Sequence, residues 1–261
     1  MSEPAILQSV EGHVGVLTIN QPKTLNALSV PVLLELEDAL AAMEANAEIR
    51  VIVFTGAGDR AFVAGGDIAD LNSREGLAHY GEFAEVIHRV FRKIETTDKP
   101  TIGAVNGWAL GGGTELMLCL DLRFIADTAK VGLPEITLGI FPGAGGTQRA
   151  IRQLPLCKAK ELMFMGDQMT ADEAVGIGLA NRTVPKDELM AFCMDYAARL
   201  ARKSPLTLKL LKRTLRDGAD MPLSAAISHE QAMIGLVFDT RDAHEGTAAF
   251  LEKRDAEFTG E

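Results

Sequence analysis

The chain has few aromatic residues and no excess of basic ones, and both shortages exclude kinds of partner. One tryptophan and two tyrosines in 261 residues leave little material for the platforms on which single-stranded nucleic acids stack. Lysine and arginine number 26 against 36 aspartates and glutamates, so the formal net charge is −10. Nucleic acids and anionic membranes bind basic faces, and this charge argues against both as general partners. A small anionic ligand is compatible with the sequence, because a few local lysines can outweigh distant negative charge.

Cysteines and long apolar runs are also scarce. Cys119, Cys157 and Cys193 are isolated in apolar segments, and their spacing matches neither a disulfide framework nor a zinc site. We expect three reduced, buried thiols and no metal. No apolar run is long enough to span a bilayer, and residues 1–4 lack the basic and apolar regions of a secretory signal. We therefore expect a cytoplasmic protein.

Apolar runs alternate with helical periodicity along the first two hundred residues. The pattern predicts helices over residues 29–46 and 80–95, and strands over residues 6–11, 14–20, 50–55, 101–105 and 122–126. Strands that alternate with helices favour right-handed crossovers and a mostly parallel sheet. Residues 57–78 are rich in glycine and aspartate and are expected to form a long irregular loop. Loops of that length in a compact domain are usually functional.

The remainder of the chain is predicted to be largely helical. A capping-box pattern at residues 170–173 begins a short helix, and further helices are expected over residues 187–203, 205–216, 223–238 and 242–254. The composition changes near residue 200. We therefore expect an α/β core over residues 1–200 and an α-helical region over residues 201–261, within the size that one large core can support.

Residues 106–117 carry the strongest chemical signal. Gly111, Gly112 and Gly113 lie between a predicted strand and a predicted helix, where missing Cβ atoms let the backbone approach a ligand. Amides at the start of a helix are free to bind an anion, and Glu115 follows within the first turn. Anion donors beside a carboxylic acid indicate stabilisation of an oxyanion. Tight packing of helix against strand explains the glycines equally well.

Two further segments combine with the triple glycine. Glu135 lies between Pro134 and an apolar run, an unusual place for a solvated acid, although a helix-terminal charge or a salt bridge would explain it. Gly65 and Gly66 precede Asp67, which is also the pattern of a turn followed by a helix cap. Two glycine-rich loops and two acids in apolar settings together favour an oxyanion site with proton transfer beside it.

Other catalytic motifs are missing. Residues 143–147 lack the ending of a phosphate-binding P-loop, and Gln148 stands where a dinucleotide fingerprint needs glycine. No serine-nucleophile motif occurs, and the five histidines form no metal-binding pattern.

Taken together, the motifs resemble those of the crotonase superfamily, in particular the enoyl-CoA hydratase/isomerase group. The resemblance runs from about residue 15 to residue 257, and its segments keep the family order: residues 20–28, 62–68, 106–115, 134–149 and 250–253. It implies an α/β fold, a crotonase-like spiral of ββα units with a helical C-terminal region that forms a homotrimer, commonly within a homohexamer. It also implies an acyl-CoA thioester as substrate in fatty acid metabolism, with no separate cofactor because coenzyme A is part of the substrate.

The resemblance assigns roles to individual residues. The amides of Gly66 and Gly112 match the family's oxyanion donors, and Gly143 matches the position that helps to hold water. Family members often carry alanine where this chain has Gly66, but a backbone donor does not depend on the side chain. Seven residues match positions along CoA, the last two reaching it from a neighbouring subunit: Lys23, Leu25, Ala64, Asp67, Ile68, Phe250 and Lys253.

The two acids distinguish activities within the superfamily. Hydratases resemble this chain in carrying acids at both positions, whereas isomerases usually keep only the one that matches Glu135. The resemblance therefore implies hydration of a trans-2-enoyl-CoA to a 3-hydroxyacyl-CoA, with Glu115 as base on the water and Glu135 as proton donor to C2. A carboxylate in a helix's first turn favours ionisation, and desolvation favours a protonated Glu135, although the pair can titrate as a unit.

Two alternatives stay open at this point. One is another superfamily reaction on an acyl-CoA thioester, either enoyl-CoA isomerisation or thioester hydrolysis. The other is a non-catalytic scaffold that binds CoA or RNA, because a fold need not keep its activity.

Overall fold

A six-stranded sheet forms the centre of the molecule. The structure is a computed structural model that describes residues 3–261, so Met1 and Ser2, which belong to the segment tested for a secretory signal, lie outside it. The strand order is β1-β2-β3-β5-β7-β10. The strands are β1 (Ile6–Glu11), β2 (Val14–Ile19), β3 (Val51–Gly56), β5 (Thr101–Val105), β7 (Leu122–Ala126) and β10 (Arg182–Val184). β1 pairs antiparallel with β2 and the other neighbours pair parallel, which confirms the predicted mostly parallel sheet.

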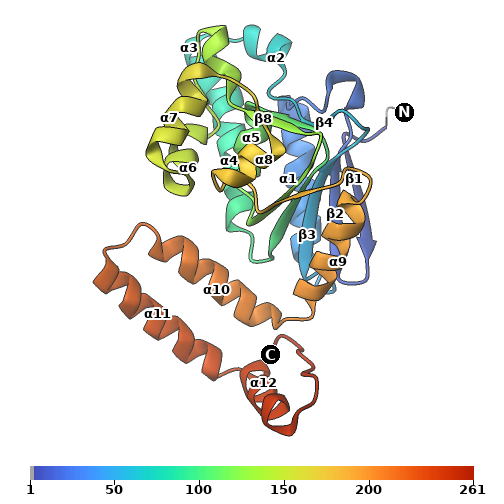
Figure 1. Cartoon of the computed structure of the whole chain (residues 1–261), viewed down its shortest axis with the longest axis vertical. Coiled ribbons are helices and arrows are strands. Elements are labelled where there is room, and N and C mark those ends of the chain that lie inside the picture. The colour runs from blue at the N-terminus through green and yellow to red at the C-terminus, as the bar shows by residue number, and fades with distance from the viewer. Residues whose placement is uncertain (1–2) are drawn as a thin grey trace.

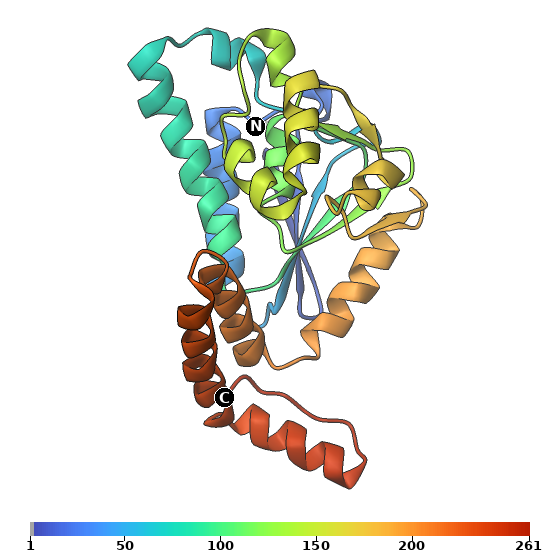
Figure 2. The same ribbon diagram turned by 60° about the vertical axis from the view of Figure 1, so that its left-hand side comes forward.

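The central strands are apolar because both of their faces are covered. Every residue of β3 and β5 is buried, as expected for parallel strands between layers of helices. The helices α1 (Val30–Ala45) and α4 (Glu85–Thr96) pack against each other. Figure 2 shows them on one side of the large sheet and α9 (Leu189–Ala201) on the other.

A second, smaller sheet lies beside the first and is not anticipated by the sequence pattern. Its order is β4-β6-β8-β9, formed by β4 (Ala61–Val63), β6 (Trp108–Leu110), β8 (Lys130–Gly132) and β9 (Met169–Thr170). Strands of two or three residues are too short to show an alternating pattern. The pairs β3–β4, β5–β6 and β7–β8 each place one strand in the large sheet and the next in the small one, and a helix follows. This repeat is the expected succession of ββα units.

The prediction of one irregular loop over residues 57–78 is wrong in part. It contains β4 and two short helices, α2 (Ile68–Asn72) and α3 (Gly76–His79), and a π-helical turn (Tyr80–Ala84) then leads into α4. Asp67 caps α2, because its Oδ1 accepts hydrogen bonds from the amides of Ala69 (3.0 Å) and Asp70 (3.1 Å). The glycine and aspartate residues of this segment therefore belong to a helix start as well as to turns.

The remaining helices include the predicted capping box. The other helices before residue 180 are η1 (Pro22–Thr24), α5 (Gly112–Met117), η3 (Pro134–Leu138), α6 (Gly146–Gln153), α7 (Leu156–Met165) and α8 (Ala171–Gly176). Thr170 accepts from the amide of Glu173 (3.3 Å), and the Glu173 carboxylate accepts from the amide of Thr170 (2.7 Å). Cys119 and Cys193 are buried as expected, but Cys157 is exposed on α7, so that prediction is wrong for one thiol of three.

Three helices follow the α/β part: α10 (Pro205–Gly218), α11 (Leu223–Phe238) and α12 (Arg241–Glu252). Figure 1 shows them extending away from the two sheets. Ion pairs from Lys209 and Arg213 to Asp98, and from Lys212 to Asp121, join α10 to the rest of the chain. The predicted helices agree with these bounds to within a few residues, and the domain division at residue 200 stays a prediction. Between residues 3 and 261, no helix has the length and hydropathy needed to cross a membrane.

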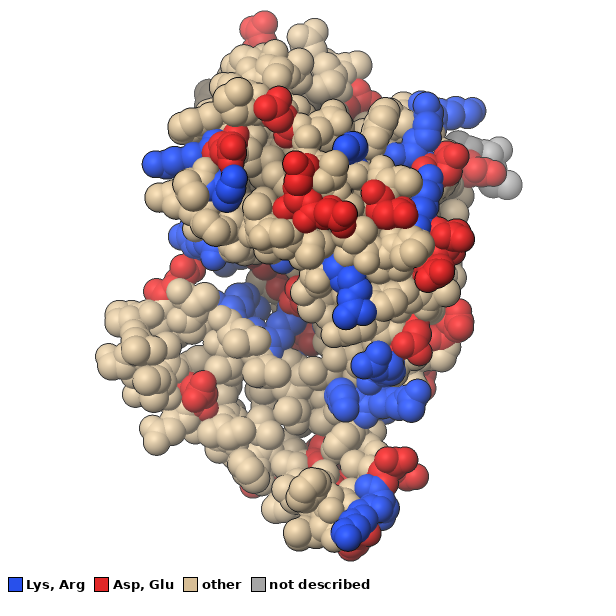
Figure 3. All heavy atoms as spheres, viewed as in Figure 1, with Lys and Arg blue, Asp and Glu red and all other residues tan. Residues whose placement is uncertain are grey.

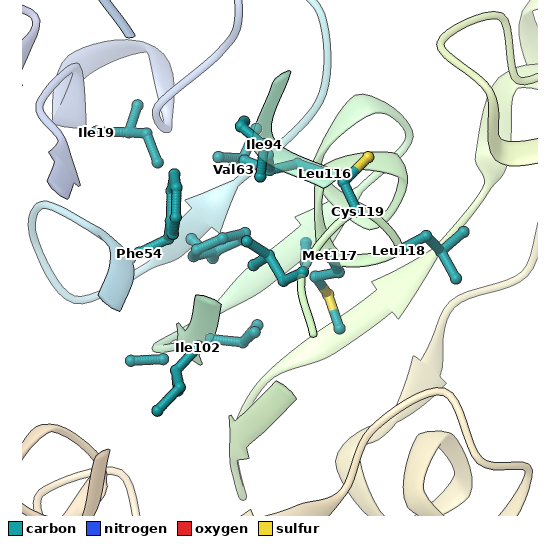
Figure 4. Packing of buried hydrophobic residues seen from close by; sticks show 14 of the residues in the cluster. Ile19, Phe54, Val63, Ile94, Ile102, Leu116, Met117, Leu118 and Cys119 are labelled. Atoms are coloured by element: carbon teal, nitrogen blue, oxygen red, sulfur yellow. The ribbon is translucent and has the colours of Figure 1, made fainter. Parts of the chain in front are cut away.

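The hydrophobic core anchors the segment that carries the triple glycine. Phe54, Ile102, Leu116 and Met117 are fully buried, and Figure 4 shows them within one packed cluster with Val63 of the small sheet. Leu116 and Met117 directly follow Glu115 on α5. The position of Glu115 is therefore set by core packing.

Candidate active site

Gly66 and Gly112 meet although they come from separate loops. A Cβ atom on Gly112 would lie 3.5 Å from the amide nitrogen of Gly66. The β-bridge between Leu28 and Gly66 uses the amides of Leu28 and Asp67, so the amide of Gly66 takes no part in it. Gly112 is the first residue of α5, and the first amides of a helix have no acceptor within it. Two backbone donors unused by secondary structure are thus side by side.

The three successive glycines have different surroundings. Gly111 has a φ of +52°, a conformation that favours glycine, and its amide donates to the carbonyl of Gly132 (2.9 Å). Gly113 packs so closely that a Cβ atom would lie 1.9 Å from the carbonyl oxygen of Val63, whereas Gly112 faces the amide of Gly66. Tight packing of helix against strand therefore explains Gly113, whereas approach of a ligand to the backbone of Gly112 stays a prediction.

Replacing Gly113 by alanine is expected to destabilise the fold by about 3 kcal/mol, near the upper end of the usual cost of overpacking. The added methyl group meets backbone, which cannot move aside as a flexible side chain can. Denaturant unfolding followed by circular dichroism measures the effect. Gly176→Ala on α8 is the matched control, because a Cβ there has no neighbour within 4 Å and alanine favours a helix. Equal unfolding midpoints for wild type and Gly113→Ala would contradict the packing role.

Glu115 is a buried acid held by two backbone amides. The residue is only 2% exposed. Its Oε1 accepts hydrogen bonds from the amides of Ala144 (2.7 Å) and Gly146 (2.7 Å). Burial raises the pKa of Glu115 above its ordinary value, while both amides and the positive charge of Arg149 oppose that rise. Within residues 3–261 no hydrogen bond is made to Oε2 of this carboxylate.

Glu135 has a different environment. It lies in η3, directly after β8, and its Oε1 packs 2.8 Å from the position that a Cβ on Gly111 would take. Its Oε2 is buried and has no hydrogen-bond partner among the described residues. Burial, and to a smaller extent the nearby negative charge of Glu115, raise the pKa of Glu135 to about 7. The carboxyl is therefore protonated in a large fraction of molecules at neutral pH, as a proton donor needs.

Two donors to Glu115 are missed by the sequence interpretation, which selects Gly143 in the same loop. Gly143 is exposed, and a Cβ there would meet only the carbonyl oxygen of Phe141, at 3.7 Å. The amides of Ala144 and Gly146 instead make the contacts with Glu115. Gly146 as the first residue of a helix is the signal that could have identified this loop as a carboxylate-binding one. The role of Gly143 in holding water stays a prediction.

The expected CoA positions fall into two groups. The amide of Ala64 donates to the carbonyl of Leu25 (3.0 Å), so the segment around Leu25 runs beside the segment that contains Gly66. These two segments carry five of the seven residues, which are Lys23, Leu25, Ala64, Asp67 and Ile68. The structure uses the carboxylate of Asp67 as the cap of α2. Contact of these residues with CoA stays a prediction.

The other two CoA positions lie far from the site in this chain. Phe250 is 83% exposed on α12, and Lys253 follows the last turn of the same helix. Figure 1 shows α12 at the opposite end of the molecule from α5. One chain by itself therefore does not bring Phe250 and Lys253 to the two glutamates, and their approach from a neighbouring subunit stays a prediction.

The fold and the site define an α/β protein that can polarise a carbonyl oxygen and transfer protons beside it. The family model for enoyl-CoA hydratase/isomerase matches residues 9–261. The chain is 43% identical to the crotonyl-CoA hydratase of Syntrophomonas wolfei, over 99% of both chains. It is 39% identical to the short-chain-enoyl-CoA hydratase of Clostridium acetobutylicum, over 97% of this chain and 96% of the relative.

Solved structures agree with the sequence comparisons. The crystal structure of an enoyl-CoA hydratase from Bacillus anthracis superimposes with a TM-score of 0.95 at 35% identity, covering 98% of this chain and 100% of the other. The chain belongs to the enoyl-CoA hydratase/isomerase family, and its fold is the crotonase fold.

Proposed function

We infer that the protein is an enoyl-CoA hydratase, which adds water across the double bond of a trans-2-enoyl-CoA to give a 3-hydroxyacyl-CoA. Full-length relatives at 43% and 39% identity carry hydratase names. The observation that carries the inference is the junction of two backbone donors, Gly66 and Gly112, in a site whose two acids have different environments. An oxyanion site with both an acid and a base suits addition of water to a conjugated thioester.

The two amides act on the thioester carbonyl. In the proposed reaction its oxygen accepts hydrogen bonds from Gly66 and Gly112, which draws electron density from C3 and stabilises the enolate that forms. Each such donor lowers the barrier by about 2.7–4 kcal/mol in enzymes where one has been removed. Because both donors are backbone groups fixed by α5 and by the Leu28–Gly66 bridge, they need no reorganisation during the reaction.

The two acids complete the proton balance. Oε2 of Glu115 takes a proton from water as the water oxygen bonds to C3, and the electron pair of the double bond moves into the enolate. The enolate then re-forms the carbonyl as C2 takes the proton of Glu135. The protonated Glu115 and the ionised Glu135 exchange one proton with solvent before the next turnover. The amides on Oε1 support the ionised form of Glu115, and burial supports the protonated form of Glu135.

Substrate binding and assembly form part of the same proposal. CoA lies along Lys23, Leu25, Ala64, Asp67 and Ile68, with no separate cofactor, and Phe250 and Lys253 reach it from a neighbouring subunit of a homotrimer or homohexamer. Large apolar side chains exposed on the C-terminal helices support such an assembly, because exposed apolar patches mark interfaces. They include Leu223, Ile227, Phe238 and Phe250. We place the protein in the cytoplasm.

Two observations favour hydration over the alternatives. An isomerase needs one acid, whereas this site contains Glu115 with its own pair of amide donors. An RNA-binding scaffold needs a basic face, and the net charge is −10. Figure 3 shows acidic and basic side chains interspersed over the face that it presents.

Purified protein is expected to hydrate crotonyl-CoA, with absorbance loss of the conjugated thioester as the measurement. Longer 2-enoyl thioesters define the chain-length range, and a 3-enoyl thioester of equal length is the matched comparison. We expect faster consumption of the 2-enoyl substrate and a 3-hydroxyacyl-CoA as product by mass spectrometry. Conversion of the 3-enoyl thioester to the 2-enoyl one without hydration would identify an isomerase, and release of free CoA would identify a hydrolase.

A further inference from the structure

Arg149 lies directly behind the loop that holds Glu115. It belongs to α6, and its side chain is only 14% exposed. Nε and Nη2 donate to the two carboxylate oxygens of Glu95 at 3.0 and 2.8 Å, and Nη1 donates to the carbonyl oxygen of Ala144 at 3.1 Å. The guanidinium therefore joins α4, which carries Glu95, to the segment between η3 and α6.

Ala144 is held from both sides. Its amide donates to Oε1 of Glu115, and its carbonyl accepts from Arg149. The next residue, Gly145, has a φ of +99°, and a Cβ there would lie 2.1 Å from Nη1 of Arg149. The guanidinium thus fills the space that any side chain at position 145 would need. Glycine at this position and arginine four residues later form one packed unit.

The arginine is well suited to fix this loop. A guanidinium offers five donors in a rigid plane, so it can bind a carboxylate with two of them and a carbonyl with a third. Its anchor is also rigid, because Phe91 and Ile94 on the same helix as Glu95 are fully buried. Lysine has a single point charge on a flexible stem and cannot reproduce these three contacts in one plane.

We propose that Arg149, oriented by Glu95, is a positioning residue for Glu115 that fixes the loop whose amides hold the carboxylate. The inference rests on the proposed function of Glu115 as base. Loss of Arg149 frees the peptide of Ala144, and both amide contacts to Oε1 weaken together. The carboxylate of Glu115 then loses its orientation toward the water. Its ionised form also loses the charge of Arg149 and has weaker hydrogen bonds from the amides of Ala144 and Gly146.

The test compares Arg149→Met with Arg152→Met. Both arginines lie on α6 and both changes remove one positive charge, but Arg152 is half exposed and pairs with Asp220. For Arg149→Met we expect kcat for crotonyl-CoA to fall about 10²-fold, as for a small misplacement of a reacting group, with KM little changed. The acid limb of its kcat–pH profile moves to higher pH, because Glu115 must be ionised to accept a proton. Arg152→Met is expected to keep the wild-type profile.

Further measurements separate positioning from a loss of fold. Circular dichroism and size-exclusion chromatography establish the folded fraction, and Glu95→Gln, which keeps an acceptor for Arg149, is expected to lower kcat less than Arg149→Met does. Matching pH profiles for Arg149→Met and Arg152→Met would overturn the inference. Inactive wild-type protein would instead count against the proposed function. A crystal structure of Arg149→Met tests positioning without activity: amides of Ala144 and Gly146 still within hydrogen-bonding distance of Glu115 would overturn it.

Discussion

Glutamine in place of either Glu115 or Glu135 is expected to lower kcat for hydration of crotonyl-CoA by about 10³-fold, within the range that general acid–base groups contribute. Glutamine keeps the size and shape of glutamate, so Glu135→Gln preserves the packing against Gly111. It can neither take a proton from water nor deliver one to C2. Affinity for a saturated acyl-CoA, measured by calorimetry, should survive, because neither acid is assigned to CoA binding.

The two acids are expected to control opposite limbs of the activity–pH profile. The reaction needs Glu135 protonated, so activity should fall as pH rises through about 7, the pKa to which burial raises this carboxyl. It needs Glu115 ionised, so activity should also fall on the acid side. Glu161→Gln on α7, an exposed acid paired with Lys158, is the control and should keep the wild-type profile. Near-normal turnover in Glu115→Gln or Glu135→Gln would remove that residue from the mechanism.

Proline at position 112 is expected to lower kcat about 10²–10³-fold, the usual cost of one lost oxyanion donor. Proline has no N–H, yet it is tolerated at the first position of a helix, which Gly112 occupies in α5. The substitution thus removes the donor at a helix position where proline is tolerated. Steady-state kinetics measures the loss, and circular dichroism checks the helix content.

Gly112→Ala is the matched comparison for this donor. It adds a Cβ atom in ordinary contact with the amide of Gly66, at 3.5 Å, and keeps the N–H. We expect it to retain far more activity than Gly112→Pro. Equal activity of the two variants at equal folded fraction would show that the amide of Gly112 does not bind the developing oxyanion.

Prediction of the fold from the sequence succeeded where segments are long and failed where they are short. The central strands β3 and β5 of the large sheet have six and five residues, all of them buried, so their apolar runs are visible. The strands of the small sheet have two or three residues, and pairing with distant partners makes them strands. The family resemblance implied ββα units, and the order of these short strands comes from the structure alone.

Residue types along the chain were enough to select both acids and the two glycine-rich segments, because those chemistries depend on which side chain is present or missing. The family resemblance then selected Gly66 and Gly112 within these segments. Packing decided the rest. The junction of the two amides, the hold of Ala144 and Gly146 on Glu115, and the pKa of about 7 for Glu135 all depend on distant segments. Every residue but proline has an amide, and burial comes from neighbours far along the chain. Only the folded structure determines which amide meets which oxygen and which acid loses its water.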